Sequence, residues 1–493
     1  MRSRNRVTRR GFLALSGGSV AGVLLASCAA PAPTPTPAPA AKPAEPQPAA
    51  TATPKPAEPK PAEPKPAAPT AAPTKPAEAK PSAAAGEIKF LARGDDAIFK
   101  VFRDLRDAFQ KEYAKIKVAI DESPGDWYQK FQLQIASGTP PDAVFESAGT
   151  CTATARAGGL QALDDYMKSD KRFKKEDYWD IAFLPSQWQG KTYHLPYDGG
   201  SMALYYNKEM FAANGIKNLD PKTPITMQEL LDISFKLTTD QSGKHPGESG
   251  FDPKRMKTYG YNGRTWWAFV FAFAGEVFSE DGKTVRIHEP AAVEGIQWLG
   301  DLGTKHFVAP SPEFEQAQTL SFSTGAIGIN YGGVWDSVRQ RQNKFDWDVA
   351  PFPKGKAKVS TGWYSGLSIT SGSKLKDAAW EWVFFCCSEP GQKIVSSLGQ
   401  AVPAVKALAN TDAFLDPKTK PEHKQVFLDE MDGKILRLPG DKQGAPFMGY
   451  WREFGQVINP MLDPVWRGKK TAADALKEAQ PKLNHLLATG QVT

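Results

Sequence analysis

The chain has 493 residues, and its formal charge of +7 comes from the amino-terminal 86 residues. Residues 1–28 carry five Arg and no acidic residue, and residues 29–86 add a net charge of +2. The remaining 407 residues are therefore neutral overall. This argues against a nucleic-acid-binding body, which carries its own positive excess. A body of this length also exceeds one ordinary core and predicts two or three lobes.

The first 28 residues have the pattern of an export signal. The five Arg precede an apolar stretch that is shorter than the about 20 apolar residues of a membrane-spanning helix. The string Thr8–Ala14 contains the pair Arg9-Arg10 and resembles a twin-arginine signal. Leu25-Ala26-Ser27-Cys28 resembles a bacterial lipobox, in which the Cys is lipidated and begins the mature protein. The alternative is a simple cleaved signal with an incidental Cys.

Residues 29–86 have the composition of a disordered linker. They hold 18 of the 41 Pro residues, and almost no large apolar side chain. Such a segment cannot offset the entropy lost on ordering, which predicts a spacer; a Pro-rich recognition motif is the alternative. A lipid on Cys28 would then hold an extracytoplasmic body at the outer face of the cytoplasmic membrane.

Strand and helix patterns alternate from residue 87 to residue 145. Short apolar runs at 88–91, 116–120 and 143–145 predict strands, and helical periodicity lies between them. This order predicts a mostly parallel sheet with helices on its faces. Ligands bind at the carboxyl ends of such strands, which selects the loops 92–96, 122–127 and 146–151.

The later sequence contains more helices than strands. Thr226-Met-Gln-Glu229 is a capping box before a Leu-rich helix, and helices are expected over 291–302 and 471–488. The polar stretch 238–260 looks like an insertion, and its role is unknown.

Three cysteines follow Cys28, and an odd number does not suit a disulfide framework. Cys386 and Cys387 end an apolar helical run, so we interpret them as buried small hydrophobic residues. A bridge from Cys151 to one of them is the alternative.

No catalytic motif stands out. The chain has no Gly-x-Ser-x-Gly, no His-Glu-x-x-His and no Cys-x-x-Cys, and its six His residues show no ligand spacing. The sequence therefore predicts neither enzymatic activity nor a metal or cofactor.

Aromatic residues beside Gly, polar or charged residues are more informative. An indole face covers the C–H groups of a sugar, while neighbouring polar groups pair with its hydroxyls. For any single Trp, core packing is the alternative. The candidates in such surroundings are Trp127, Trp266, Trp267, Trp335, Trp363 and Trp451.

Several stretches occur in a familiar order: Ala136–Asp142, Gly190–Tyr197 followed by Leu204–Lys208, Thr223–Glu229, Phe322–Trp335 and Asp346–Pro353. In this order the body, from about residue 87 to 487, resembles the solute-binding proteins of ABC importers. The similar group is the carbohydrate-binding one that includes maltose-binding protein.

The resemblance implies a periplasmic-binding-protein-like fold with two α/β lobes, each a mostly parallel sheet flanked by helices. Lobe one would comprise 87–197 and 356–399, and lobe two 200–350 and 403–493. Hinge crossings are expected near 197–201, 351–355 and 399–402. The ligand would lie between the lobes, which close by hinge motion into the state that a permease recognises.

The resemblance also implies roles for particular residues. Trp335, Trp451 and the Trp266–Trp267 region correspond to aromatics that stack on sugar. Arg93, Asp95, Glu146 and Asp198 fall where polar contacts are expected. Glu146 replaces an aromatic of the maltose binders, and Gly149-Thr150 replaces an Asp-Arg pair, which favours a ligand other than maltodextrin.

The resulting prediction is a lipid-anchored, monomeric binding protein that captures a sugar or oligosaccharide for ABC permease subunits, without a cofactor. A binder of a charged solute, such as a sugar phosphate or a polyamine, is the alternative on the same fold. An anchored carbohydrate-active enzyme is the alternative of another class.

Overall fold

The structure is a computed structural model that describes residues 84–492, apart from 280, 318–319, 360–362 and 432–449. The chain divides into two compact units, Met1–Pro76 and Ala77–Thr493. The expected signal at 1–28, with Cys28, lies outside the described residues, as does nearly all of the expected linker. Among the described helices, none combines the length and apolar character needed to cross a bilayer.

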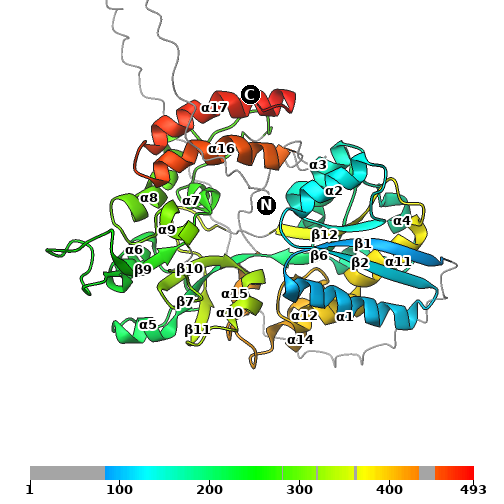
Figure 1. Cartoon of the computed structure of the whole chain (residues 1–493), viewed down its shortest axis with the longest axis horizontal. Helices are drawn as coiled ribbons and strands as arrows, with labels where there is room; N and C mark the ends of the chain where they lie inside the picture. The colour runs from blue at the N-terminus through cyan, green and yellow to red at the C-terminus, as the bar shows by residue number, and fades with distance from the viewer. Residues whose placement is uncertain (1–83, 280, 318–319, 360–362, 432–449, 493) are drawn as a thin grey trace, which may run out of the picture. The chain divides into compact units, whose positions relative to one another are not determined.

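The first sheet has six strands in the order β13-β6-β12-β3-β1-β2 (Figure 1). β1 pairs in parallel with β2 and β3, whereas β12 runs antiparallel to β3 and β6, and β13 antiparallel to β6. Five longer helices belong to this lobe. The bounds are β1 Gly86–Arg93, β2 Ile116–Ser123, β3 Ala143–Glu146, β6 Leu195–Gly200, β12 Trp363–Ile369, β13 Val402–Pro403, α1 Asp96–Glu112, α2 Trp127–Ala136, α3 Ala148–Arg156, α11 Lys376–Cys387 and α12 Glu389–Ser397.

The second sheet has five strands in the order β11-β7-β10-β9-β8. Among the described residues of this sheet, β9 and β10 pair in parallel, whereas the other neighbouring strands pair in antiparallel fashion. The bounds are β7 Met202–Asn207, β8 Thr239–Asp240, β9 Met256–Asn262, β10 Ile327–Gly333, β11 Trp347–Ala350, α6 Met227–Leu237, α7 Trp266–Ala272, α8 Pro290–Thr304, α16 Trp451–Trp466 and α17 Ala472–Thr489.

Shorter elements connect these parts. They are α4 Asp164–Ser169, α5 Lys208–Ala213, α9 Pro312–Ala317, α10 Ser337–Gln340, α13 Lys406–Ala409, α14 Asp412–Leu415, α15 Gln425–Asp429, the strands β4 Gln187–Trp188 and β5 Lys191–Thr192, and the 3-10 helices η1 Lys175–Asp177, η2 Asp180–Ser186 and η3 Val334–Asp336.

The expected two-lobed α/β fold is confirmed, but both sheets are mixed, so their expected mostly parallel character is wrong. The parallel part of the first sheet is the βαβαβ unit that the sequence pattern showed. The antiparallel strands β6 and β12 are those that carry the chain to and from the second sheet. The direction of β6 and β12 follows from these connections between the two sheets. Local periodicity in the sequence carries no information about such connections.

The passages between the sheets can be located along the chain. β6 ends at Gly200 and β7 begins at Met202, so that Ser201 joins the two sheets. The Ser201 hydroxyl donates a 2.6 Å hydrogen bond to the Phe427 carbonyl. The second passage lies between β11 and β12. The third passage between the sheets lies later in the chain than the expected 399–402. The reason is that β13 at Val402–Pro403 still pairs with β6 and so belongs to the first sheet.

Local sequence patterns produce the helices that they predicted. In the capping box before α6, the Glu229 amide donates to the Thr226 hydroxyl at 3.1 Å, and the Thr226 amide donates to the Glu229 carboxylate at 2.7 Å. This arrangement satisfies two amides that would otherwise lack partners. The helix expected over 471–488 is α17, and its buried apolar face comprises Ala475, Leu476, Ala479, Leu483 and Leu486.

The cysteines and the polar insertion are also placed. Cys151, Cys386 and Cys387 are buried free thiols, so the alternative of a disulfide is not realised. Burial raises the pKa of each thiol well above its usual value. The 238–260 stretch contributes the edge strand β8 and a loop around the Asp240 carboxylate, which accepts from the amides of Ser242, Lys244 and Asp252.

Candidate functional site

A polar cluster lies at one edge of the first sheet. Arg93 is the last residue of β1 and Glu146 the last of β3, so both stand where parallel strands end. The Arg93 guanidinium donates to the Ser365 hydroxyl at 3.1 Å and lies 4.1 Å from the ring centre of Phe145. Burial lowers the pKa of Arg93, while the charges of Asp198 and Glu146 oppose that shift.

Glu146 is the most unusual member of this cluster. Its side chain is fully buried, and neither carboxylate oxygen has a hydrogen-bond partner among the described residues. Burial raises the pKa of Glu146 to about 7, opposed by the nearby hydroxyls of Thr150 and Thr154 and by Arg93. Those hydroxyls donate instead to the carbonyls of Ser147 at 3.1 Å and Thr150 at 2.9 Å. The two hydroxyls therefore lower the pKa of the Glu146 carboxyl group from nearby, but neither of them is hydrogen-bonded to it.

The other two acidic candidates differ from Glu146. Asp198, in β6, is half-buried, and burial raises its pKa while the Arg93 charge opposes the rise. Asp95 is exposed and caps α1, where it accepts from the amides of Ala97 and Ile98 at 3.1 and 3.2 Å. Burial, and to a smaller extent the charge of Asp95, raise the pKa of Asp336. Asp95 therefore lies near η3 of the second lobe.

The first turn of α16 joins the two lobes. α16 packs on α17 and α8 of the second lobe and also contacts α3 of the first (Figure 1). Arg156 pairs with Glu453 at 3.0 Å, and its guanidinium lies 4.0 Å from the ring centre of Tyr450. Arg452 lies 4.9 Å from the ring centre of Tyr128 in α2. We call this set of contacts, made by Tyr450–Glu453, the α16 interface.

Two candidate tryptophans, Trp127 and Trp451, lie close to these elements, and a third, Trp335, is partly exposed. Trp127 begins α2, half-buried, with its ring centre 5.6 Å from the Arg93 guanidinium. The Trp451 ring rests on Gly149, because a Cβ added there would lie 2.8 Å from the indole Cδ1. Trp335 in η3 is 37% exposed. Trp363 begins β12, and its side chain lies outside the described part of the chain.

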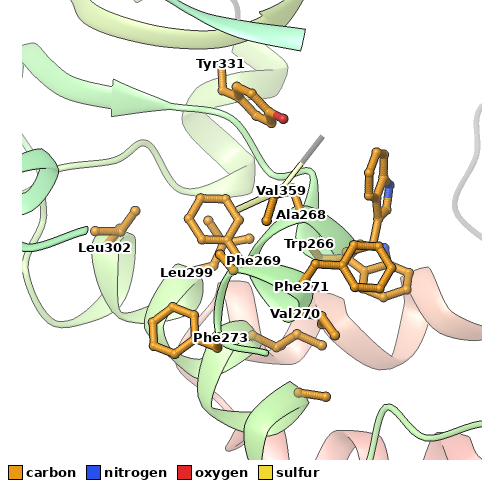
Figure 2. Close-up of a cluster of buried hydrophobic side chains, with 14 of the residues drawn as sticks. Trp266, Ala268, Phe269, Val270, Phe271, Phe273, Leu299, Leu302, Tyr331 and Val359 are labelled. Atoms are coloured by element: carbon orange, nitrogen blue, oxygen red, sulfur yellow. The ribbon is translucent and has the colours of Figure 1, made fainter. Parts of the chain in front are cut away.

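Trp266 and Trp267, which follow polar residues in the sequence, lie in a helix. Both lie in α7, 8% and 7% exposed, within the largest buried cluster of the second lobe. Figure 2 shows Trp266 in this cluster. Trp266 stacks on Phe454 of α16, with ring centres 6.2 Å apart. The run from Trp266 to Phe273 is apolar on every side, which is the signature of a fully buried helix and was visible in the sequence. Both rings therefore pack in the core of the second lobe, and their part in solute binding stays a prediction.

The partners in the α16 interface were not predicted from the sequence. Arg156 and Glu453 are 297 residues apart in the chain, so no local pattern connects them. The only available signal was the position of Arg452 beside Trp451.

One His-Asp-Glu group among the described residues has ligand atoms close enough for a metal: Asp348, Glu422 and His423. The protein itself supplies their partners. His423 Nδ1 lies 2.5 Å from Asp348, and Lys420 lies 3.1 Å from Glu422. We therefore interpret these three residues as part of an ion-pair cluster. That the protein binds no metal stays a prediction.

Two α/β lobes, with polar and aromatic groups gathered where they meet, define the class of a two-lobed binding protein. Residues 96–393 match the family described as bacterial extracellular solute-binding protein. The chain belongs to this family, as the resemblance predicted, and thus to a class of binding proteins and not of enzymes.

Individual relatives are distant. A binding protein of Brucella abortus (strain 2308) is 25% identical over 417 residues, covering 82% of this chain and 94% of that one. The diacetylchitobiose binding protein DasA of Streptomyces coelicolor is 24% identical over 416 residues, covering 79% and 87%. The solved substrate-binding protein Lmo0181 of Listeria monocytogenes, in complex with cycloalternan, superposes with a TM-score of 0.71 at 23% identity, covering 82% and 99%. This likeness supports the two-lobed fold.

Proposed function

We propose that the chain is the solute-binding component of an ABC importer and captures a sugar or oligosaccharide between its two lobes. The family assignment supports the binding role. The ligands named for DasA and for the Listeria protein support the carbohydrate class.

The observation that carries the carbohydrate proposal is a set of buried polar atoms without partners. Within the part of the chain that the structure describes, Arg93 Nε and Arg156 Nε are unpaired donors, whereas both Glu146 oxygens and Glu453 Oε2 are unpaired acceptors. Arg93 and Glu146 end the paired strands β1 and β3, whereas Arg156 and Glu453 pair across the contact between α3 and α16. Buried polar groups are normally satisfied, so a bound solute is the natural source of the missing partners.

The mixture of donors and acceptors selects among solutes. A hydroxyl group both donates and accepts, whereas a phosphate dianion only accepts and an ammonium group only donates. A neutral polyhydroxylated solute therefore suits the set better than a sugar phosphate or a polyamine. The rings of Trp127 and Trp451 offer apolar faces for the C–H side of a sugar.

The rest of the proposal concerns location and partners. A lipid on Cys28 would hold the body at the outer face of the cytoplasmic membrane, through the Pro-rich linker at 29–86. The closed, solute-bound body, as a monomer, would be what the permease subunits recognise. The neutral charge of the body supports a solute, and not a nucleic acid, as the ligand.

The test is a thermal-shift and calorimetric screen of the purified full chain. The panel is N,N′-diacetylchitobiose, maltotriose, glucose 6-phosphate and spermidine. A specific binder should stabilise the protein by about 2.7 kcal/mol at a hundredfold excess over Kd. We expect a sugar of the panel to do so, N,N′-diacetylchitobiose before maltotriose, since Glu146 and Gly149-Thr150 favour a ligand other than maltodextrin. Stabilisation by spermidine or the sugar phosphate alone would overturn the carbohydrate proposal.

A further inference from the structure

One arginine of the second lobe is hydrogen-bonded to the end of a helix in the first. Arg341 follows α10, and its guanidinium donates to two backbone carbonyls. Nη1 donates to the Leu398 carbonyl at 2.6 Å, and Nε donates to the Lys420 carbonyl at 2.7 Å. Leu398 caps the carboxyl end of α12, a helix of the first lobe. The bond to Leu398 therefore crosses between the lobes.

The second lobe holds Arg341 in place through α10. The Tyr205 phenol of β7 donates to the Gly333 carbonyl at 2.6 Å and lies 2.9 Å from the hydroxyl of Ser337, the first residue of α10. Tyr205 is fully buried. These bonds fix α10 to the second sheet, so Arg341 at its end has a rigid base.

The Lys420 carbonyl also belongs to the second lobe. The Lys420 ammonium donates to the Trp347 carbonyl of β11 at 3.2 Å, and His423 lies 2.5 Å from Asp348 of the same strand. The bond from Arg341 to Lys420 is therefore internal to the second lobe. It orients the guanidinium and leaves Nη1 for the carbonyl of the first lobe.

The carboxyl end of α12 suits a cation at close range. The last carbonyls of a helix lack intrahelical partners and lie at the negative end of the helix dipole. Gly399 follows Leu398 with φ of 57°, and a Cβ built on it would lie 2.7 Å from Arg341 Nη2. The absence of a side chain at Gly399 thus permits the approach of the guanidinium.

The contact is tight but not fully satisfied. Arg341 Nη2 is buried and has no hydrogen-bond partner among the described residues. A buried donor without a partner costs free energy, which offsets part of the gain from the other two bonds. The net stabilisation is therefore moderate, as a reversible contact requires.

This contact and the α16 interface lie on different sides of the first passage between the sheets. Figure 1 shows α16 above β6 and β7, and α10 and α12 below them. Rotation of one lobe about Ser201, which joins β6 to β7, displaces α12 relative to α10. A hydrogen bond is lost when its heavy atoms move apart by about 1 Å. The bond from Arg341 to Leu398 therefore forms only over a narrow range of angles between the lobes.

We propose that Arg341 is a latch for the joined lobes. Its bond to the Leu398 carbonyl forms together with the α16 interface, as in this structure, and breaks when the lobes separate. Arg341 thereby sets the equilibrium between joined and separated lobes, and it is a positioning residue because it acts through their orientation. This inference rests on the hinge motion of the proposed function but not on the class of solute.

The test measures the distance between the lobes in the solute-free full chain. Spin labels are attached at Gln129→Cys in α2 and Lys477→Cys in α17, both exposed positions, in a chain that carries Cys28→Ala. The three other cysteines are buried. Arg341→Met keeps the length of the side chain and removes the donors. Loss of one charge-assisted bond should raise the ratio of separated to joined lobes about tenfold or more, seen as a longer distance between the labels.

Calorimetry of the unlabelled chain with N,N′-diacetylchitobiose and maltotriose gives a second readout. If the lobes of the wild-type chain are mostly joined, Arg341→Met changes chiefly the distance distribution. If they are mostly separated, it lowers the affinity about tenfold, because the solute binds the joined fraction. Arg341→Lys keeps the charge and can reach one carbonyl, so its effect should be intermediate; it also serves as the variant to measure if Arg341→Met does not fold.

Arg172→Met is the matched control. Arg172 pairs with Asp170 at 2.6 Å and with Glu381 at 2.9 Å, entirely within the first lobe. Its replacement should lower the melting temperature and leave both the distance between the lobes and the affinity unchanged. This control separates a loss of stability from the loss of a latch.

The outcomes are distinguishable. If both Arg341 variants leave the distance distribution and the affinity unchanged, the latch is overturned. Shorter distances or tighter binding would overturn it as well, since Arg341 would then hold the lobes apart. If the chain binds neither sugar, the proposed function fails, whereas the distance distributions still decide the role of Arg341.

Discussion

The contact between Arg156 in α3 and Glu453 in α16 gives the sharpest mechanical prediction, because it joins residues of the two lobes. The pair is 3.0 Å apart with side chains 29% and 26% exposed, so partial solvent screening limits its contribution to about 1 kcal/mol. The same guanidinium lies 4.0 Å from the Tyr450 ring centre, which adds about 0.5–1 kcal/mol. Arg156→Ala should therefore destabilise the joined arrangement of the lobes by about 1–2 kcal/mol.

That free energy corresponds to a factor of about 5–30 in the equilibrium between joined and separated lobes. If the solute is bound in the joined arrangement, its affinity should fall by the same factor. Calorimetry of the full chain with Arg156→Ala, Glu453→Gln and the double variant would isolate the coupling between the two side chains. We expect a coupling free energy of about 1 kcal/mol.

Arg286→Ala is the control for this experiment. Arg286 pairs with Glu289 at 2.7 Å within the second lobe. Replacing Arg286 by Ala changes the net charge by the same amount as Arg156→Ala but leaves the α16 interface intact. It should leave the affinity unchanged. Wild-type affinity in Arg156→Ala, or tighter binding, would refute the claim that the α16 interface belongs to the solute-bound arrangement.

The remaining predictions concern aromatic residues and the lipid. Trp335→Ala should weaken sugar binding about tenfold and leave the solute-free melting temperature nearly unchanged, since the ring is 37% exposed; a large loss of stability would instead show a packing role. Trp266→Ala should cost about 3–5 kcal/mol in urea unfolding, because that ring is 8% exposed and stacked on Phe454; a loss below about 1 kcal/mol would contradict this. Cys28→Ala should release the chain from the membrane fraction without changing affinity, and continued membrane retention would argue against the lipid.

Local physics explains what the sequence predicted well. The capping box before α6 and the helix expected over 471–488 rest on short-range patterns, and both formed as expected. The first three strands of the body and their helices followed from periodicity. The placement of Arg93 and Glu146 at one edge followed from the rule that parallel strands end together.

Long-range contacts explain what it missed. The directions of β6 and β12 depend on the passages between two sheets, and the two-residue strand β13 has no periodicity to detect. The pairing of Arg156 with Glu453 likewise depends on the tertiary fold. The burial of Trp266 and Trp267, by contrast, has a local signal in the sequence, namely the apolar run that extends from Trp266 to Phe273.

One measurement tests the central claim most directly. The purified chain is titrated with N,N′-diacetylchitobiose and with maltotriose, and the solute recovered after release is analysed by mass spectrometry. The proposal calls for saturable binding of one molecule of one of these sugars per chain and for recovery of that sugar with its mass unchanged. Absence of binding by both, or recovery of cleaved or modified sugar, would contradict capture without chemistry.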